Sequence, residues 1–451
     1  MTMKKQNLRY MKWIGKMIVL LFIFNFQFSI FDCSAQRISL DECLEKALES
    51  NFSIKIIRNE ARMDKNNLNY STFLPTLEGT AKQTQTRNDT KTENSAGEVN
   101  KMSDVKTDNY TAGVALNWRI FDGLEMFTTH EKQKELLAMG ELAVQQAVEN
   151  LILNVSAAYY NVLVQHHKLM AARHSLELSN ERYDEARVRY KIGNRSGLEA
   201  QQAKIDLNTD SSTYVRQKEA LKSAYITLNK LMNTDLQMVN YVQDTILLGP
   251  QLALGTLEQK TLAGNTTLLI AKKDQKISAL DLKNARAVLF PTLDFNSGYN
   301  YNKTDTPSSS TTLNRSNGFY WGFSLNVPIF SRLQNRTMIK NAKLELENTE
   351  LSYQEAEKET LGDLALMYNS YENNLLMVNF EIESASVAEA NLDAALEKYK
   401  IGSLSGIEFR EFQRSYIDAV DRKLSAIYQA KVSELSLLLL SGDIRGSFVS
   451  E

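Results

Sequence analysis

Apolar residues recur every seven positions along two stretches of the chain, each about 70 residues long and free of proline. A seven-residue step places these side chains on one face of a helix and is typical of coiled-coil packing. The pattern predicts two helices of about 100 Å each, over Gly123–Ile192 and Arg332–Ile401. The recurring residues are Val148, Val155, Val162, Leu169, Leu176, Tyr183 and Tyr190 in the first stretch, and Leu364, Tyr371, Val378, Ala385, Leu392 and Tyr399 in the second.

The first of these stretches carries a second stripe, made mostly of small residues. Ala158, Ala172, Ser179 and Ala186 lie along it. Small side chains let two helix backbones approach closely, so this helix is expected to have neighbours on two sides. A curved wall of helices meets that requirement better than an isolated pair.

Between Pro75 and Phe121, and again between Pro291 and Phe330, the period of the apolar residues changes from helical to two. This alternation predicts two β-hairpins with one apolar, aromatic-rich face and one polar or small face. Such strands are long enough to cross an outer membrane when tilted, and the alternative is a water-soluble sheet with one covered face. Four strands cannot close a barrel, so a membrane role requires a dimer with eight strands or a trimer with twelve. The clearest apolar row is Phe319, Trp321, Phe323, Leu325, Val327 and Ile329.

A long internal repeat organises the chain. The segment Arg189–Glu199, RYKIGNRSGLE, recurs 209 residues later at Lys398–Glu408 as KYKIGSLSGIE, and Phe121 and Phe330 obey the same offset. Such a repeat indicates two copies of one structural unit. Each copy is predicted to run helix, β-hairpin, long helix, turn and returning helix.

Both long helices are predicted to end at the repeated YKIG turn. Gly193 and Gly402 would supply the left-handed conformation of a helix C-terminus, and Ser196 and Ser405 would begin helices that return antiparallel. Predicted helix starts carry capping boxes, in which a side chain and a Glu or Gln three residues later bond each other's backbone N–H groups. These boxes are Ser39/Glu42, Asp122/Glu125, Ser196/Glu199, Thr256/Gln259, Ser331/Gln334 and Ser405/Glu408.

The predicted organisation follows from these elements. Shorter helices are expected before the hairpins, over Leu40–Leu74 and Leu257–Phe290, and after the turns, over Gly197–Met232 and Gly406–Leu440. The chain is therefore expected to begin with a signal peptide at 1–35. Repeat one follows, with helices at 36–74 and 122–233 around a membrane β-hairpin at 75–121, and an equatorial linker at 234–255 joins it to repeat two. Repeat two has helices at 256–290 and 331–440 around a second membrane hairpin at 291–330, and a C-terminal tail at 441–451 ends the chain.

The first 35 residues are expected to be a targeting segment. A basic region precedes the apolar run Met17–Phe24, and Cys33, Ser34 and Ala35 supply small residues for cleavage before Gln36. The alternative is a lipid-anchor signal in which Cys33 is the modified residue. Cleavage would change the net charge from −2 to about −6, which argues against nucleic acid as a partner.

No enzyme signature appears in the sequence. It contains no phosphate-binding GxxxxGK[ST] loop, no HExxH and no GxSxG motif. The histidines, His130, His166, His167 and His174, all fall on the first long helix, where solvated positions explain them better than a metal site. We expect no catalytic residue, no cofactor and no metal, but passive conduction whose energy comes from a partner.

These features resemble the TolC family of outer-membrane efflux and secretion channels over essentially all of the mature chain. The resemblance is carried by the two-fold repeat, the FLPTL and LFPTL segments that lead into the hairpins, the IFDG and IFSR exits, and the YKIG…S…E turn. It implies a mixed, mostly α fold and a homotrimer, in which a twelve-stranded transmembrane β-barrel in a Gram-negative outer membrane continues into a twelve-helix periplasmic α-barrel. It also implies that the helical tips dock onto a periplasmic adaptor (membrane fusion) protein, which joins the channel to an inner-membrane pump.

The resemblance assigns two kinds of site. Acidic residues near the family's pore constriction match Glu199, Glu408 and Glu411, and the tyrosine of its closing network matches Tyr399. Glu199 and Glu408 have a second explanation as capping-box members. The arginine that some members use for closure is Leu404 here, so the resemblance does not identify which residues hold the channel closed. The adaptor-docking turns match Tyr190, Lys191, Ile192, Gly193, Ser196, Tyr399, Lys400, Ile401, Gly402 and Ser405.

Two other functions compete with an exit duct. A structural coiled-coil protein of the periplasm or cell surface would explain the helices, but not the strands with an aromatic face. A periplasmic adaptor predicts one helical hairpin with a lipoyl-like β domain, not two helical hairpins and two β pairs. The sequence does not identify the cargo, because drug efflux, metal efflux and type I protein secretion use the same kind of duct.

Overall fold

The computed structural model describes residues 37–192, 196–239, 241–242, 245–307 and 312–446. The predicted targeting segment 1–35, with Cys33, lies outside these residues, and so does Gly193. The chain is mostly helical, with one larger sheet, and forms two compact units. The hairpin unit contains 37–49, Asn154–Leu248 and Leu375–Lys431, whereas the sheet unit contains Ser50–Leu153, Gly249–Asn374 and 432–446.

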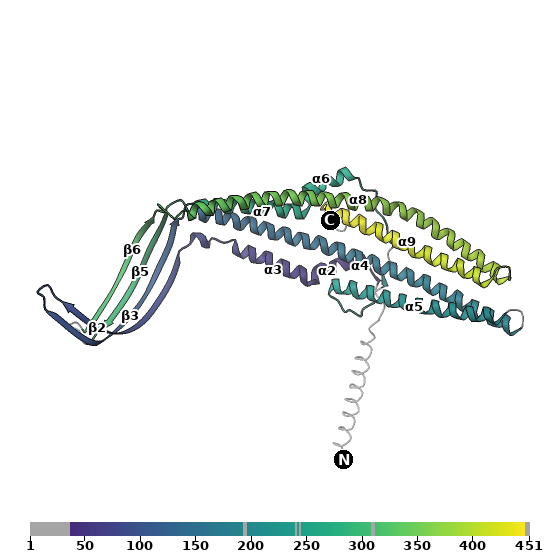
Figure 1. Ribbon diagram of the computed structural model, residues 1–451, viewed down its shortest axis with the longest axis horizontal. Coiled ribbons are helices and arrows are strands. Elements are labelled where there is room, and N and C mark those ends of the chain that lie inside the picture. Colours follow the sequence, from purple (N-terminus) through teal and green to yellow (C-terminus); the bar gives the residue numbers. More distant parts are fainter. Residues whose placement is uncertain (1–36, 193–195, 240, 243–244, 308–311, 447–451) are drawn as a thin grey trace, which may run out of the picture. The chain divides into compact units, whose positions relative to one another are not determined.

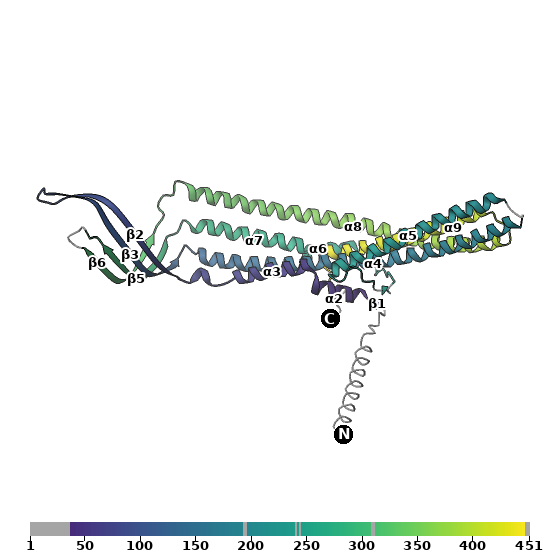
Figure 2. The same cartoon turned by 90° about the horizontal axis from the view of Figure 1, so that it is seen from below.

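The sheet unit is built on a four-stranded antiparallel sheet of order β2-β3-β5-β6, whose strands lie side by side in Figures 1 and 2. The strands are β2 (Thr76–Glu93), β3 (Val99–Phe121), β5 (Thr292–Asp305) and β6 (Leu313–Asn326). The two predicted hairpins therefore pair with each other through β3 and β5. This pairing leaves β2 and β6 at the two edges of the sheet.

The strand register confirms the predicted alternation of faces. Phe323 lies opposite Phe295, which lies opposite Trp118, so these side chains share one face of the sheet. The rings of Phe295 and Phe323 are in contact, with centroids 5.1 Å apart. Polar and small residues line most of the other face, and there Tyr320 lies opposite Gly298, where a Cβ would be 2.8 Å from the Tyr320 hydroxyl. On the apolar face, large side chains of β6 remain exposed in the described part of the chain.

The strands are longer than the sequence predicted. Their composition, rich in Thr, Asn, Ser and Lys, predicts exposed loops over Arg87–Asp108 and Asn302–Asn317. Instead β2 and β3 continue to a tight turn in which the Asn94 N–H donates to the Glu98 carbonyl at 3.1 Å. The prediction was wrong because ladder hydrogen bonds between strands need no apolar side chains.

The helices before the hairpins are each interrupted, where a single helix was predicted. The first consists of α2 (Leu40–Ser50) and α3 (Phe52–Asn67), and the second of α6 (Leu254–Gly264) and α7 (Thr266–Ala287). An asparagine stands at each break. The Asn51 side chain accepts from the Ser53 N–H at 2.9 Å, and the Asn265 side chain accepts from the Leu268 N–H at 3.1 Å. Each asparagine thereby starts a new helix as its N-cap.

The two long helices are confirmed as α4 (Glu125–Lys191) and α8 (Gln334–Lys400), each of 67 residues. Their starts differ from the predicted capping boxes Asp122/Glu125 and Ser331/Gln334. Each is preceded by a left-handed pair, Gly123–Leu124 or Arg332–Leu333, and the first residue of the helix is the Glu or Gln itself. The box prediction was wrong because the chain turns through these left-handed residues before the helix begins.

The predicted Thr256/Gln259 capping box is also wrong. The helix α6 already begins at Leu254, after Ala253 at the N-cap, so both residues of the box lie inside it. Nearby, the Gly249 N–H donates to the Glu434 carboxylate at 3.1 Å, and Lys260 pairs with Asp443. The end of the linker therefore lies against the C-terminal segment within the sheet unit.

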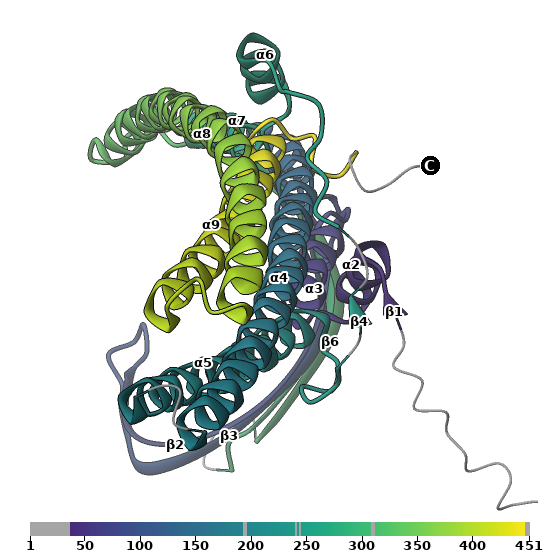
Figure 3. The ribbon, with the colours of Figure 1, turned by 90° about the vertical axis from the view of Figure 1, so that its right-hand side faces the viewer.

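The hairpin unit contains two antiparallel helix pairs. The helix α5 (Gly197–Met232) returns along α4, and α9 (Gly406–Leu440) returns along α8, as Figure 3 shows from the turn end. A short parallel pair, β1 (Arg37–Ile38) with β4 (Tyr241–Val242), completes the unit. Every member of the second predicted seam is buried: Leu364 and Tyr371 in the part of α8 that belongs to the sheet unit, and Val378, Ala385, Leu392 and Tyr399 in the hairpin unit.

Within the described ranges, no helix has both the length and the apolar content that crossing a lipid bilayer requires.

Candidate functional site

The turn of repeat two is fixed by hydrogen bonds on both sides. Gly402 adopts the predicted left-handed conformation, with φ of 80°. The Gly402 N–H donates to the Tyr399 carbonyl at 3.0 Å, and the Ser403 N–H donates to the Lys398 carbonyl at 2.9 Å. This is the Schellman arrangement that closes a helix C-terminus.

The next helix then opens with the predicted capping box. The Ser405 N–H donates to the Glu408 carboxylate at 2.9 Å, and the Glu408 N–H donates to the Ser405 hydroxyl at 3.2 Å. Hydrogen bonding with the side chain and backbone of Ser405 lowers the pKa of the Glu408 carboxyl. A charged Glu408 therefore stabilises the helix start, whatever other role it has.

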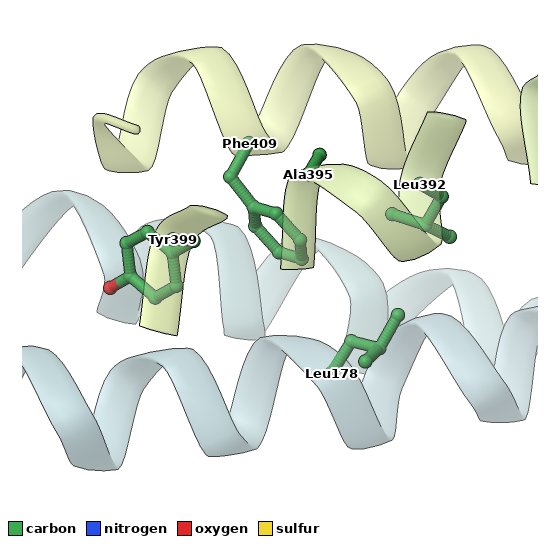
Figure 4. Close-up of a cluster of buried hydrophobic side chains, with 5 residues drawn as sticks. All are labelled: Leu178, Leu392, Ala395, Tyr399 and Phe409. Atoms are coloured by element: carbon green, nitrogen blue, oxygen red, sulfur yellow. The ribbon is translucent and has the colours of Figure 1, made fainter. Parts of the chain in front are cut away.

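Tyr399 belongs to a buried cluster that joins the two helix pairs, shown in Figure 4. Its side chain is 2% exposed and stacks on Phe409, with ring centroids 5.3 Å apart. The Arg189 guanidinium of α4 lies 5.2 Å from the Tyr399 ring centroid and donates to the Tyr399 and Lys400 carbonyls at 3.4 and 3.3 Å. Burial raises the pKa of the Tyr399 phenol. The other buried members are Leu178, Leu392 and Ala395.

The turn of repeat one is packed differently. Ser196 caps α5 by accepting from the Leu198 N–H at 3.2 Å. Tyr190, the counterpart of Tyr399, is 54% exposed, and its ring lies 3.0 Å from the position that a Cβ on Gly197 would take. Ala200 stands where repeat two has Phe409, so Tyr190 has no ring to stack on at that position.

The predicted docking residues are therefore mostly at the surface. Tyr399 is the exception, because its ring is buried. Gly193 lies outside the described residues, as stated above. The exposed ones are Tyr190, Lys191, Ile192, Ser196, Lys400, Ile401, Gly402 and Ser405.

The predicted acidic residues do not form one cluster within the chain. Glu408 is exposed and held by its capping box. Glu411 lines a groove of about 560 Å³ between α5 and α9, together with Arg410 and Arg414. Glu199 is half-buried and lines a different groove.

That second groove, here called the tip groove, lies between the starts of α5 and α9 and has a volume of about 330 Å³. Leu198 from repeat one and Ile407 from repeat two, which are equivalent positions of the repeat, form exposed apolar walls. The lining residues are Arg182, Ser196, Leu198, Glu199, Gln202, Ser405, Gly406 and Ile407.

A buried polar cluster around Asp210 connects three helices and was not anticipated from the sequence. The Arg410 guanidinium of α9 donates to both Asp210 oxygens on α5, at 2.6 and 2.8 Å. Ser175 of α4 donates to the same carboxylate at 3.2 Å, and Gln413 of α9 donates to the Ser175 carbonyl at 2.8 Å. The Asp210 cluster therefore ties the α4/α5 pair to α9 through satisfied, charge-assisted hydrogen bonds.

A signal for this cluster was present along α4. The small-residue stripe includes Ser179, and Ser175 and Arg182 lie three or four residues from it, on the same helix face. Arg182 pairs with Asp206 of α5 at 2.8 Å. Polar residues on a buried helix face require partners, but the sequence did not reveal which residues those were.

Two of the four histidines are as solvated as predicted, and two are half-buried. His130 and His166 are half-buried, and His130 stacks on Tyr70 with ring centroids 5.3 Å apart. His167 and His174 are exposed, and His174 makes an edge contact with the Tyr416 ring. Partial burial lowers the pKa of the His167 imidazole.

Comparison with known proteins gives a consistent result. Residues 43–234 and 257–443 match the family model described as "Outer membrane efflux protein". The probable outer membrane lipoprotein SilC of Salmonella typhimurium is 22% identical over 74% of this chain and 73% of its own length. The outer membrane protein TolC of Escherichia coli K12 is 20% identical over 72% of this chain and 68% of its own length. The crystal structure of the Campylobacter jejuni CmeC outer membrane channel superposes with a TM-score of 0.76 at 18% identity, covering 90% of this chain and 86% of that one.

Proposed function

The chain belongs to the outer membrane efflux protein family, and we propose that three copies of it form the exit duct of a tripartite export system. It is an outer-membrane channel protein and not an enzyme. Members of this family work in tripartite systems with a periplasmic adaptor and an inner-membrane pump. In such a system the outer-membrane component conducts passively, and its partners supply the energy.

The observation that carries the proposal is the open sheet. The edge strands β2 and β6 each have a single strand neighbour among the described residues. Four strands cannot close on themselves, but a β2 edge of one copy could pair with a β6 edge of the next. The exposed aromatic residues of one face, including Phe319 and Trp321, suit contact with lipid. Closure by three copies gives a twelve-stranded barrel that is wide enough for a lumen.

The same two-fold unit supports a tunnel of twelve helices. Each copy supplies two antiparallel helix pairs of equivalent sequence, so three copies supply six pairs. The segments 36–74, 122–233, 256–290 and 331–440 form this α-barrel, whereas 75–121 and 291–330 form the membrane hairpins. The residues 234–255 and 441–451 lie outside both barrels. The segment 1–35 is removed as a signal peptide, or cleavage before Cys33 leaves that residue as a lipid anchor.

Docking onto the adaptor is assigned to the turns of both repeats. Their exposed apolar side chains, Ile192 and Ile401 among them, form an apolar surface of the kind that a protein partner covers. Glu408 and Glu411 are assigned to the pore constriction, where a three-fold ring of carboxylates would favour cations. Glu199 and Tyr399 complete the candidate gate, although burial restricts Tyr399 to a packing role in this conformation.

The test is conduction by the purified channel in planar lipid bilayers. The wild-type protein should form pores that favour cations, and Glu408→Gln combined with Glu411→Gln should lower that selectivity. Glu177→Gln, an exposed change on α4 outside the candidate gate, is the matched control and should leave the reversal potential unchanged. Absence of conductance from folded protein would contradict the duct, whereas unchanged selectivity in the double variant would contradict the gate alone.

The cargo is a separate proposal. Small molecules and secreted proteins both fit a passive duct, since selectivity for cargo resides largely in the pump. A deletion strain profiled for drug sensitivity, metal sensitivity and secreted proteins separates these classes directly.

A further inference from the structure

We infer that the lipid-facing side of the sheet carries a binding site for the phosphate groups of an anionic outer-leaflet lipid, formed by Lys303 of β5 and Arg315 of β6. These two residues are here called the rim pair. The inference rests on the membrane sheet proposed above and names the class of lipid that this sheet binds at its outer end. The family resemblance assigns no role to either residue.

The first observation is that the two cations lie directly opposite each other. The strand register pairs Lys303 with Arg315, so their side chains leave the same face of the sheet. Like charges at such positions repel and destabilise the pairing of the strands. Among the residues that the structure describes, no carboxylate forms an ion pair with either one, and the Lys303 ammonium lies 5.2 Å from the Tyr110 ring centroid. An anion bound between the two side chains would remove the repulsion.

The second observation is where the rim pair lies on the apolar face. In the direction away from α7 and α8 (Figures 1 and 2), this face of β6 carries the exposed rings of Trp321 and Phe319 and then Arg315. The same face of β5 carries the exposed ring of Tyr301 and then Lys303. On the described strands, no charged side chain of this face lies between the rim pair and the helices. The rim pair therefore marks the outer end of the apolar face.

The third observation is the height of that face. Leu325 and Arg315 are ten residues apart on β6, which corresponds to about 33 Å along a strand. At the tilt of about 40° that membrane barrels adopt, this length spans about 25 Å of the bilayer. The apolar band of such barrels is also about 25 Å tall. With Leu325 at the inner edge of this band, the rim pair lies at the level of the outer-leaflet headgroups.

The other charges of this face lie farther toward the tip of the sheet, and its other cations already have partners. Lys106 pairs with Asp108 at 3.1 Å, and Arg87 pairs with Asp104 at 3.7 Å. Asp305 lies opposite Asp108, on the side of the rim pair away from the apolar face. The rim pair is therefore the part of this face that offers positive charge next to the apolar surface.

The chemistry of the pair favours a phosphate that belongs to a lipid. The Arg315 guanidinium can donate two parallel hydrogen bonds to phosphate oxygens, and the Lys303 ammonium adds a point charge. A free anion would gain only these contacts. An anionic lipid would also place its acyl chains against the adjoining aromatic face, while its phosphate stays at headgroup level. Continuity of the cations with the apolar face therefore identifies the occupant as a lipid.

The experiment measures lipid binding to the full channel in detergent by native mass spectrometry. The probes are diphosphoryl lipid A, the same lipid without its phosphates, and inorganic phosphate. We expect wild type to bind diphosphoryl lipid A at least about tenfold more tightly than the dephosphorylated form, and Lys303→Gln combined with Arg315→Gln to remove this preference. Lys303→Arg combined with Arg315→Lys keeps both charges and should keep the preference.

The matched control removes two exposed cations from other places in the sheet unit. Lys55 lies on α3, and Lys82 lies opposite Thr111 on the other face of the sheet. Lys55→Gln combined with Lys82→Gln changes the net charge as much as the double rim variant does. It should bind both forms of lipid A as wild type does.

Three results would overturn the inference. The first is binding of diphosphoryl lipid A by the double rim variant within twofold of wild type. The second is equal binding of the two forms of lipid A by wild type, which would show that the acyl chains alone are recognised. The third is displacement of lipid A by inorganic phosphate of similar affinity, which would identify a site for a free anion.

Salt provides a measurement on the wild type alone if the double rim variant does not fold. Raising the ammonium acetate concentration should weaken binding of diphosphoryl lipid A but not of the dephosphorylated form, and equal salt dependence of the two would contradict the inference. Conductance in planar bilayers tests the duct separately. A conducting channel without preference for the phosphorylated lipid would refute the rim site alone, whereas folded protein without conductance would contradict the duct on which it rests.

Discussion

The two turns of the hairpin unit share one eleven-residue motif but differ in their packing. In repeat two, Tyr399 is buried and stacks on Phe409, which is 0% exposed. In repeat one, Tyr190 is exposed and Ala200 replaces the phenylalanine. A single position, 209 residues apart in the two copies, therefore determines whether the motif's tyrosine has a ring partner.

The polar contacts differ in the same way. Arg410 of repeat two reaches Asp210 of repeat one and joins the Asp210 cluster, whereas its counterpart in repeat one is the exposed Gln201. The α8/α9 pair is thus anchored to its neighbour by groups that the α4/α5 pair does not repeat. Three sets of substitutions test this difference between the two turns.

The largest effect is expected from removing the ring that distinguishes the two turns. Phe409→Ala leaves a cavity beside Tyr399 and should lower the free energy of unfolding by about 4 kcal/mol. The matched change in repeat one, Ala200→Gly, removes only a methyl group from a helix and should cost about 1 kcal/mol. Denaturant titration, with unfolding monitored by circular dichroism, measures both losses in the free energy of unfolding. Equal losses would show that the two turns are packed alike.

The next effect concerns the ion pair between the helix pairs. Arg410→Ala leaves the Asp210 carboxylate buried without its cation and should cost about 3 kcal/mol, while Gln201→Ala should cost little because that side chain is exposed. In a double-mutant cycle, Asp210→Ala should cost less when Arg410 is already Ala. The same titration measures all four proteins, and strictly additive losses would contradict a direct coupling.

The smallest effect is a dependence on pH. Burial, and then the charge of Glu185, raise the pKa of Tyr399, so the folded chain holds this proton more tightly than the unfolded chain, whose phenol titrates at about 10. The free energy of unfolding should therefore be unaffected below that pH. It should fall as pH rises from there toward the folded pKa, by at most about 1.4 kcal/mol per pH unit for this one proton.

Substituting the two tyrosines tests that dependence. Tyr399→Phe should make the alkaline loss of stability shallower, and Tyr190→Phe should not, because Tyr190 is exposed. Stability measured between pH 9 and pH 11 provides the comparison. The same slope for wild type and Tyr399→Phe would show that the buried phenol makes no contribution.

Local patterns predicted most of the helical elements. Seven-residue spacing located α4 and α8, and the Gly402 turn and the Ser405 capping box followed from residue types at fixed spacings. Period-two alternation identified the strands and their faces, but not their polar extensions, because backbone pairing does not depend on apolar side chains. The breaks at Asn51 and Asn265 were missed, since one polar residue does not interrupt an apolar pattern.

The polar part of the candidate site was less predictable for a different reason. Arg410 and Asp210 are 200 positions apart, so no local spacing indicates their contact. The two Arg182 donors that have no partner among the described residues likewise depend on how the two helix pairs pack. Sequence patterns identify which residues are unusual on a helix face, whereas tertiary packing decides which of them meet.

The claim that three copies form one duct is tested most directly by the mass of the conducting species. Native mass spectrometry of the channel, released from the detergent in which it conducts, should give three chains per particle. A conducting particle of one or two chains would contradict the proposed twelve-stranded barrel.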